Sequence, residues 1–521
     1  MTPGVLDHIR FQARQRPNAL AVLGPAGPIV YQALLRDVDA LATELLARGL
    51  TGADMVGLRF GINYLHLLAI LALDRLGIPS MSFATAAVEP ALAPRYGVTA
   101  IVAAEPASAN PPCRWIELAP PDRSRLRPPD PARLAQIARP VDALVRVTWS
   151  SGTTGGPKGV PLTRAILAHR LVLRRLYHNL GPQTRYFAGM PLSASPCYLV
   201  SLATLAAGGT VVLPNPSMDF ISWANTTGVT MTTASPAMLA DLLERRGNPL
   251  RRLETVTCFN VVGANLPAQL VHEARALLTP NLWVSYGTSE VDGVATAPAT
   301  LCLAEPSAAG FVSPWVEAEI VDVAYHWPTA GEGLLRLRGA AMVAGYYNDA
   351  TATRRNFRDG WFYPGDLAEI TSQGLLRIVG RIEDVIVRDG VAIAPGPIEA
   401  AIRALPQIRD VAVFPVAGAD DVPLVWAAVV LAPGTDTAAL RDAVATQLGG
   451  QAPARLLVID RLPRNAAGKV VRRELVAVAQ QSIRPADPRG PRPEDVLADP
   501  RDVRPEDMPT GPRIARPEDM P

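Results

Sequence analysis

Apolar and polar residues alternate along the first 380 residues in two recurring patterns, one typical of helices and one typical of strands. In the helical pattern, apolar residues recur every three or four positions and therefore share one helix face. In the other pattern, short continuous apolar runs indicate buried strands. The predicted helices include 5–15, 31–50 and 64–77, and the predicted strands include 55–60, 100–105, 209–214 and 255–263. This alternation predicts an α/β fold, with a large N-terminal domain of mainly parallel sheets over residues 1–380.

A second, smaller pattern follows residue 380. Helical periodicity is present at 398–405 and 440–448, and strand-like runs are present at 411–418 and 424–432. Helices and strands of this length in about a hundred residues predict a separate α+β domain. We place this small C-terminal domain at residues 381–480.

The last segment, residues 481–521, has a different composition. It is rich in proline, and it repeats RPED with a twelve-residue period set by Arg492, Arg504 and Arg516. Because few of its residues are large and apolar, it buries too little surface to offset the entropy cost of ordering. We predict a disordered tail, and both a passive repeat expansion and a partner-binding segment remain open.

Composition and charge are those of a globular protein and argue against several functional classes. The hydrophobic fraction is 49%, the charged fraction is 19% and the formal net charge is +2, without the basic stripe expected of a nucleic-acid binder. The longest apolar stretch, 198–214, contains two glycines and falls short of the roughly 18 apolar residues that span a bilayer. We therefore predict a buried helix followed by a buried strand at 198–214, and no membrane span.

The N-terminal residues and the cysteines indicate the cellular compartment. The N-terminal residues lack the apolar core of a signal peptide, so we expect them to belong to the fold. The four cysteines are far apart in the sequence and form no CxxC pair, which favours neither a zinc site nor a disulfide framework. A reducing, cytoplasmic location is expected.

Lysine is nearly absent from the chain, and its two occurrences lie in similar settings. Lys and Arg together number 50, but only Lys158 and Lys469 are lysines, and both stand beside glycine in short polar segments. An exposed lysine is readily replaced by arginine, whereas a compact ammonium that must reach one oxygen atom is not. The alternative is chance survival, but the pattern favours two sites where arginine cannot substitute.

Lys158 belongs to the stretch SGTTGGPKG at 151–159. An apolar run at 143–149 precedes it and a helical pattern follows, with Thr163 as the expected N-cap, so we predict a loop between a strand and a helix. The glycines let backbone N–H groups approach an anion, the hydroxyls add donors and Lys158 adds a charge, which together favour a polyphosphate site. The stretch lacks the GxxxxGK[ST] pattern of the usual phosphate-binding loop, and a plain flexible surface loop is the alternative.

Five stretches occur together in an order that resembles one superfamily. They are SSGTTGGPKGV (150–160), SYGTSE (285–290), GWFYPGDLAEI (360–370), GRIEDVIVRDG (380–390) and PRNAAGK (463–469). Their order and spacing are similar to those of the adenylate-forming superfamily, over about residues 5–476. That superfamily contains AMP-forming acyl-CoA synthetases, adenylation domains of peptide synthetases, and luciferases. The resemblance implies attack of a carboxylic acid on the α-phosphate of ATP, which gives an acyl-adenylate and pyrophosphate.

The resemblance also implies roles for individual residues. Glu290 would coordinate Mg²⁺, Thr288 would hydrogen-bond near the α-phosphate, and Lys469 on a mobile C-terminal domain would stabilise the transition state. Asp366 would accept hydrogen bonds from the ribose, Arg381 would reach the ribose or a phosphate, and Glu383 would be the hinge. The remaining expected ATP-binding residues are Ser151, Gly152, Thr153, Thr154, Gly155 and Lys158 around the phosphates, with Gly263, Ala264, Asn265, Tyr286 and Gly287 around the adenine.

The acid and the thiol acceptor are less constrained. Residues 186–218 contain no Asp, Glu or His, which argues against an amino acid and favours an aryl or short-to-medium aliphatic acid. The expected lining of the acid pocket is apolar and uncharged: Cys197, Tyr198, Val262 and Gly287. The departures Val387 and Ala392 from the family pattern near the thiol channel leave two acceptors open, CoA or the phosphopantetheine of an acyl carrier protein. A nucleotide-binding protein without catalysis is a third alternative.

Overall fold

The structure is a computed structural model of the 521-residue chain. It describes the following residues: 3–83, 89–107, 111, 113–118, 126–150, 157–245, 251–305, 307–322, 331–388, 391–417, 423–432, 434–464, 470–483 and 496–497. Among the predicted site residues, Ser151–Gly155 and Lys469 lie outside this part of the chain. Of the predicted tail, so do residues 484–495 and 498–521.

The N-terminal part contains a six-stranded sheet in the order β6-β5-β3-β4-β7-β8. The strands are parallel except for the last pair, β7 and β8, which is antiparallel. Their bounds are β3 (Val56–Arg59), β4 (Ser80–Ser82), β5 (Ala100–Ala103), β6 (Arg114–Glu117), β7 (Leu144–Ser150) and β8 (Lys158–Thr163). The helices of this part are α1 (Val5–Gln15), α2 (Tyr31–Ala47), α3 (Tyr64–Leu76), α4 (Glu89–Arg95), α5 (Pro131–Ala135) and α6 (Arg164–Tyr177).

A second sheet of fifteen strands follows the order β18-β19-β17-β20-β21-β15-β14-β13-β12-β11-β9-β10-β1-β2, with β16 paired to β17. Its segment from β1 to β13 is parallel, and its segment from β13 to β21 is antiparallel. The first strands are β1 (Leu20–Gly24), β2 (Gly27–Val30), β9 (Arg185–Phe187), β10 (Thr210–Val212), β11 (Met231–Ala234), β12 (Cys258–Val262) and β13 (Leu282–Thr288). The others are β14 (Asp292–Pro298), β15 (Ala308–Val312), β16 (Val316–Val321), β17 (Gly333–Gly339), β18 (Phe357–Arg358), β19 (Trp361–Phe362), β20 (Asp366–Ile370) and β21 (Leu375–Arg381).

The helices of the second sheet are α7 (Ser195–Ala206), α8 (Phe220–Thr227), α9 (Pro236–Arg245), α10 (Ala268–Leu277), α11 (Leu301–Ala304) and α12 (Ala350–Asn356). Helix α7 is buried along most of its length and leads through Gly208 and Gly209 into β10, which confirms the predicted buried helix and buried strand at 198–214. A core cluster that includes residues of α1, α2, α3 and α7 joins the two sheets. None of the helices in the described residues is both long and apolar enough to cross a bilayer.

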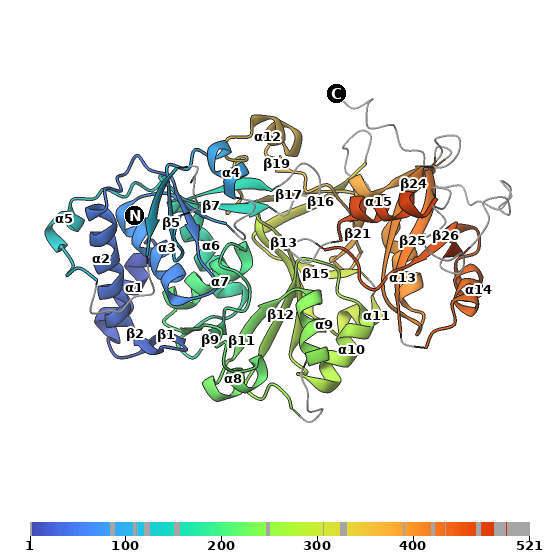
Figure 1. The fold of residues 1–521 in the computed structure, drawn as a ribbon, viewed down its shortest axis with the longest axis horizontal. Helices are drawn as coiled ribbons and strands as arrows, with labels where there is room; N and C mark the ends of the chain where they lie inside the picture. The colour runs from blue at the N-terminus through green and yellow to red at the C-terminus, as the bar shows by residue number, and fades with distance from the viewer. Residues whose placement is uncertain are drawn as a thin grey trace.

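The C-terminal lobe begins after β21 with the short 3-10 helix η2 (Ile382–Asp384). It contains β22 (Ile386–Arg388), β23 (Val391–Ile393), α13 (Pro395–Arg403), β24 (Ile408–Ala417), β25 (Pro423–Leu431), α14 (Thr437–Leu448), the 3-10 helix η3 (Gly449–Gln451), β26 (Arg455–Val458) and α15 (Arg472–Ile483). Figure 1 shows this lobe, in orange and red, at the opposite end of the molecule from α1–α3. The lobe has its own hydrophobic clusters, so the predicted α+β organisation is present.

The segment between β7 and α6 contains a strand that the sequence did not predict and a helix cap that it did. The glycine-rich loop was predicted to connect a strand to a helix, but Lys158 begins strand β8, which pairs antiparallel with β7 before α6 starts. The apolar residues Val160 and Leu162 bury their side chains in this extra strand, and the prediction of a direct strand-to-helix connection was wrong. Thr163 caps α6 as predicted, since its side chain accepts a hydrogen bond from the Ile166 N–H.

In the tail predicted at 481–521, the structure differs from disorder at five residues: 481–483 form the end of α15, and 496–497 form a short strand. Val496 and Leu497 form strand β27 (Val496–Leu497), which pairs antiparallel with β26. They are among the few large apolar residues of this segment. For the other tail residues beyond 483, disorder stays a prediction.

Candidate functional site

The SYGTSE stretch forms the end of β13 and the turn into β14. The pairing of these strands shifts register between Tyr286 and Gly287, and a Cβ at Gly287 would lie 2.6 Å from the backbone oxygen of Asp292. Glycine is therefore required for the strands to approach this closely. Thr288 stabilises the turn, because its hydroxyl oxygen accepts a hydrogen bond of 3.1 Å from the Val291 N–H.

Two buried arginines of α6 hold this turn from behind. Arg170 donates hydrogen bonds to the carbonyl oxygens of Ser289 (2.9 Å), Glu290 (2.9 Å) and Ala341 (3.1 Å). One turn of helix later, Arg174 Nε donates to both carboxylate oxygens of Asp292 at 3.0 Å. Helix α6 thus fixes the turn on both sides of Glu290.

Glu290 presents a buried carboxylate at this turn. Its residue exposure is 4%, and its Oε1 accepts a hydrogen bond of 2.7 Å from the Tyr346 hydroxyl. Burial raises the pKa of Glu290, whereas the hydrogen bond from Tyr346 and the charge of Lys158 lower it. The described residues contain no cluster of three or more His, Cys, Asp or Glu side chains that could enclose a metal. A single carboxylate suits Mg²⁺, which keeps several waters and usually takes one or two carboxylates together with substrate phosphates.

Lys158 reaches the same place from the first residue of β8. It pairs with Ser150 at the end of β7, so the strands enter and leave the glycine-rich loop side by side. Its half-buried ammonium lies 5.1 Å from the centre of the Tyr346 ring and 3.4 Å from Asn356 Oδ1. Burial lowers the pKa of Lys158, and the charge of Glu290 opposes that shift. The structure therefore brings Lys158 and Glu290, which are 132 positions apart in the sequence, to one tyrosine.

A second cluster is formed around Asp366, at the start of β20. Asp366 is 4% exposed and pairs across the sheet with Arg381, the last residue of β21, whose Nη1 donates to Asp366 Oδ1 at 2.9 Å. The Tyr286 hydroxyl donates to the other carboxylate oxygen of Asp366. Burial, followed by the charge of Asp366, raises the pKa of Tyr286. Glu383 in η2 accepts a hydrogen bond of 3.4 Å from Arg381, which links the cluster to the expected hinge.

The residues after β12 lie near Tyr286. Strand β12 is parallel to β13 with Val262 opposite Ser285, so Gly263, Ala264 and Asn265 leave the sheet at the edge where the SYGTSE turn begins. All three are exposed, and Gly263 has a φ of +93°, which favours glycine. This arrangement places the three residues at the same sheet edge as the SYGTSE turn, and their contact with adenine stays a prediction.

Two of the residues predicted to line the acid pocket are completely enclosed. Cys197 is 0% exposed and Tyr198 is 1% exposed, and both belong to the core cluster around α7. The ring of Tyr198 lies 4.5 Å from the guanidinium carbon of Arg146, which is itself buried and donates to the hydroxyls of Ser80 and Ser82. The sequence predicted an apolar, uncharged pocket around Tyr198, so the buried cation of Arg146 was not expected. Contact of Cys197, Tyr198, Val262 and Gly287 with an acid stays a prediction.

Lys469 lies outside the described residues, but the segments on either side of it are defined. Arg464 and Val470 form an antiparallel bridge, and Val471 N–H donates to the Pro463 carbonyl at 2.8 Å. Arg472, at the start of α15, donates to Asp384 (2.7 Å) and Glu399 (2.8 Å). Because Asp384 directly follows Glu383, this arginine connects the segment after Lys469 to the expected hinge.

Residues of this site that were not predicted from the sequence include Tyr346, Asn356, Arg170 and Arg174. Tyr346 and Asn356 belong to the stretch GYYNDATATRRNF at 345–357, which lies outside the five stretches that carry the family resemblance. Arg170 lies on a helix whose periodicity gave no indication that an arginine would face inward. Burial and partners of such residues depend on tertiary contacts.

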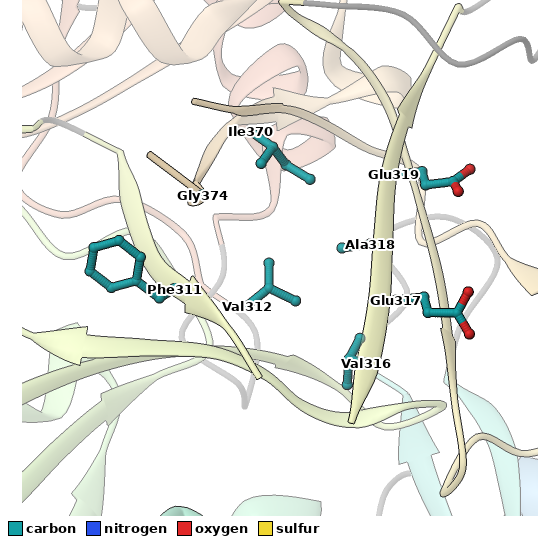
Figure 2. Close-up of a pocket in the computed structure, with 8 residues that line it drawn as sticks. All are labelled: Phe311, Val312, Val316, Glu317, Ala318, Glu319, Ile370 and Gly374. Carbon is teal, nitrogen blue, oxygen red and sulfur yellow. The ribbon is translucent and has the colours of Figure 1, made fainter. Parts of the chain in front are cut away.

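A separate pocket of about 580 Å³ lies on the antiparallel part of the large sheet and shares no residue with the predicted site. Figure 2 shows apolar side chains of Phe311, Val312 and Ile370 around the hollow, while Glu317 and Glu319 point away from it. These glutamates pair with Arg338 and Arg336 on the neighbouring strand β17. The full lining is Phe311, Val312, Val316, Glu317, Ala318, Glu319, Ile370 and Gly374.

Comparison with known proteins identifies similar sequences and structures. Residues 9–347 match the family model described as AMP-binding enzyme, and residues 397–469 match that of the AMP-binding enzyme C-terminal domain. The chain is 29% identical to the 2-succinylbenzoate–CoA ligase of Bacillus subtilis over 64% of this chain and 69% of that protein. It is 28% identical to a feruloyl-CoA synthase of an Amycolatopsis species over 89% of this chain and 96% of that protein.

Solved structures share the fold over most of the chain. The ATP-bound MatB of Rhodopseudomonas palustris is 25% identical, with a TM-score of 0.80 over 92% of this chain and 100% of that structure. The o-succinylbenzoate CoA synthetase of Bacillus subtilis in complex with ATP and magnesium is 22% identical, with a TM-score of 0.79 over 90% of this chain and 98% of that structure.

Proposed function

This chain belongs to the family of AMP-binding enzymes, and its relatives named as CoA ligases or synthetases identify it as an ATP-dependent acyl-CoA synthetase; we propose that it activates an aryl or short-to-medium aliphatic acid. The acid attacks the α-phosphate of ATP, which gives an acyl-adenylate and pyrophosphate, and the thiol of CoA then displaces AMP to form a thioester. One observation carries the proposal. Lys158 and Glu290 meet at Tyr346, Tyr286 and Arg381 meet at Asp366, and Tyr286 and Glu290 belong to the same SYGTSE stretch.

Each group has a chemical task in this reaction. Lys158 and the preceding loop, Ser151–Gly155, bind the β- and γ-phosphates and neutralise their charge. The Thr288 hydroxyl donates a hydrogen bond near the α-phosphate. Glu290 holds Mg²⁺, which supplies charge neutralisation to the phosphates when bound. Neutralisation matters because the acid and the phosphate are both anions, and alignment of the two supplies much of the rate.

The nucleoside end of ATP is assigned to the second cluster. Asp366 accepts hydrogen bonds from the ribose hydroxyls, and Arg381, which also donates a hydrogen bond to that carboxylate, reaches the ribose or a phosphate. Tyr286, Gly287 and the exposed turn Gly263–Asn265 surround the adenine. Glu383 is the hinge about which the C-terminal domain turns, and Lys469 on that domain approaches the carboxylate and the α-phosphate.

Two relatives support an aromatic acid, since their names specify 2-succinylbenzoate and ferulate as the acids that they join to CoA. The absence of Asp, Glu and His from residues 186–218 argues in the same direction. The phosphopantetheine of an acyl carrier protein remains the alternative acceptor, since Val387 and Ala392 depart from the family pattern on the segment expected to face the thiol.

The test is pyrophosphate release from ATP and Mg²⁺ across a panel of aryl, fatty and amino acids, followed by thioester formation on CoA and on a carrier protein. Lys469→Ala should abolish release with the preferred acid, by at least about 100-fold. Arg473→Ala, which removes an exposed positive charge on α15, is the matched control and should leave the rate unchanged. Equal rates for both variants, or release that no acid stimulates, would refute the assignment.

A further inference from the structure

Tyr346 lies on a short segment that is joined by backbone hydrogen bonds to both sides of the phosphate site. On one side, the Val343 N–H donates to the Glu290 carbonyl at 3.0 Å. On the other side, the Tyr347 N–H donates to the Gly159 carbonyl at 2.8 Å, directly after Lys158. The Tyr346 N–H itself is held by Thr353 Oγ1 at 2.9 Å. The segment therefore fixes the distance between strand β8 and the SYGTSE turn, with Tyr346 at the junction.

The side chain of Tyr346 contacts a different charged group through each of its two chemical parts. Its hydroxyl donates to Glu290 Oε1 at 2.7 Å, which leaves Oε2 outside that hydrogen bond. The face of its ring lies 5.1 Å from the Lys158 ammonium, a favourable cation–π distance. The ring is in turn supported edge-on by Phe357, with centroids 5.4 Å apart and planes at 79°. Tyr346 is 8% exposed, so it has little freedom to move away from either partner.

Lys158 and Glu290 do not contact each other directly. Among the described residues, no ion pair within 4.0 Å joins them, although each influences the protonation of the other. A direct ion pair would occupy the ammonium and the carboxylate with one another, and ATP would have to break it. Each charged group instead contacts a different part of the Tyr346 side chain, which stabilises both charges without pairing them.

We propose that Tyr346 is a positioning residue that separates Lys158 from Glu290 and orients the first toward phosphate and the second toward Mg²⁺. This inference rests on the proposed function, because it assigns those two groups their ligands. The two tasks belong to separable parts of the side chain: the hydroxyl orients Glu290, and the ring seats Lys158. Asn356 adds a second contact to the ammonium, at 3.4 Å.

The experiment measures ATP binding to the full chain by calorimetry, once with Mg²⁺ and once with EDTA. Tyr346→Phe removes the hydroxyl alone, and it should reduce the gain in ATP affinity that Mg²⁺ provides by about 10- to 100-fold. Affinity in EDTA should stay unchanged, because the ring remains under Lys158. Tyr346→Leu removes the ring as well, and it should additionally weaken binding in EDTA by about 3- to 30-fold. The matched control is Tyr347→Phe, since that ring stacks on Tyr96, at a centroid distance of 6.3 Å, instead of contacting Lys158 or Glu290.

A double variant shows whether the hydroxyl acts through Glu290. In a Glu290→Gln background, Tyr346→Phe should cause no further loss of the Mg²⁺ effect. The proposal is overturned if Tyr346→Phe binds ATP like the wild type in both conditions, or if it weakens binding equally with Mg²⁺ and with EDTA, as a purely structural role would. A wild-type chain whose ATP affinity ignores Mg²⁺ would overturn the metal role of Glu290 and the orientation assigned to Tyr346 together. Circular dichroism of each variant confirms that it is folded.

Discussion

The buried pair of Arg174 and Asp292 offers a direct test of how the Glu290 turn is held. The two side chains are 9% and 5% exposed, and Arg174 Nε donates to both carboxylate oxygens at 3.0 Å. Asp292 has a φ of +82°, an unusual conformation for a residue with a side chain, so the turn depends on its surroundings. We expect Arg174→Leu to destabilise the protein, because it leaves a carboxylate buried without its cation.

The magnitude follows from the burial. Removal of one partner of a buried ion pair costs about 3–5 kcal/mol, since the remaining charge loses its compensation but stays out of water. Leucine fills part of the space that the arginine stem occupied, so lost packing adds less than the lost charge pair. Asp292→Asn keeps the shape, removes the charge and should also cost several kcal/mol. The double variant contains neither charge, and it should be more stable than the sum of the single effects predicts by about 2–3 kcal/mol.

The assay is calorimetric unfolding of the four proteins in a thermodynamic cycle, with the transition of the large domain followed in each. The single variants should lower its midpoint clearly, and the double variant should regain part of the loss. The reasoning is refuted if Arg174→Leu costs less than about 1 kcal/mol, or if the two substitutions are additive to within about 0.5 kcal/mol. Arg245→Leu is a suitable control, because Arg245 pairs with Asp241 while 79% of its side chain is exposed, and exposed pairs contribute about 0–1 kcal/mol.

Three further predictions concern other parts of the molecule. In steady-state kinetics, Asp366→Asn should raise the KM for ATP by about 10- to 100-fold, because hydrogen bonds to a charged group contribute about 1.5–3 kcal/mol. The KM for the acid should stay unchanged, and a parallel change in both KM values would contradict a ribose role. Burial and the charge of Arg146 lower the pKa of His66 from 6.5 to about 3, so the folded state holds this imidazole neutral. The contribution of His66 to the free energy of unfolding should therefore be fully present above pH 6.5 and should be lost, by up to about 4 kcal/mol, as the pH drops toward 3. In denaturant titrations at pH 7 and pH 4, His66→Gln should lose less stability than the wild type. Identical pH profiles would exclude His66 as the cause. Gly310→Ala should cost at least about 2 kcal/mol in the same titrations, since Gly310 has a φ of +112° and a Cβ there would lie 2.3 Å from the Thr296 carbonyl carbon, and an unchanged midpoint would contradict the strain.

Local patterns in the sequence were sufficient for most elements and for the family. Helix 5–15 has the bounds that its periodicity predicted, and helix 64–77 and strand 255–263 are close to their observed bounds in α3 and β12. These features depend on neighbours in sequence, such as amphipathic spacing and the glycine at the end of α3, which has a φ of +64°. Glu290 and Asp366 could be predicted as site residues because each lies in a short stretch that resembles a motif of the superfamily.

Other features required the tertiary structure. The sequence did not indicate strand β8, because the pairing of Lys158 with Ser150 depends on a neighbouring strand and not on periodicity within 157–163. Nor did it show that Tyr198 would face Arg146 inside the core, since an apolar helix has the same sequence pattern whichever of its faces meets a ligand.

By itself, then, the sequence determined the class of fold, the order of the motifs and the scarcity of lysine that marked Lys158. Only the tertiary structure decided which charges meet. Glu290 and Lys158 are separated by 132 positions, and the tyrosine that contacts both is 56 positions beyond Glu290. Such contacts arise from packing of elements distant along the chain, and their energies depend on burial that no local pattern encodes.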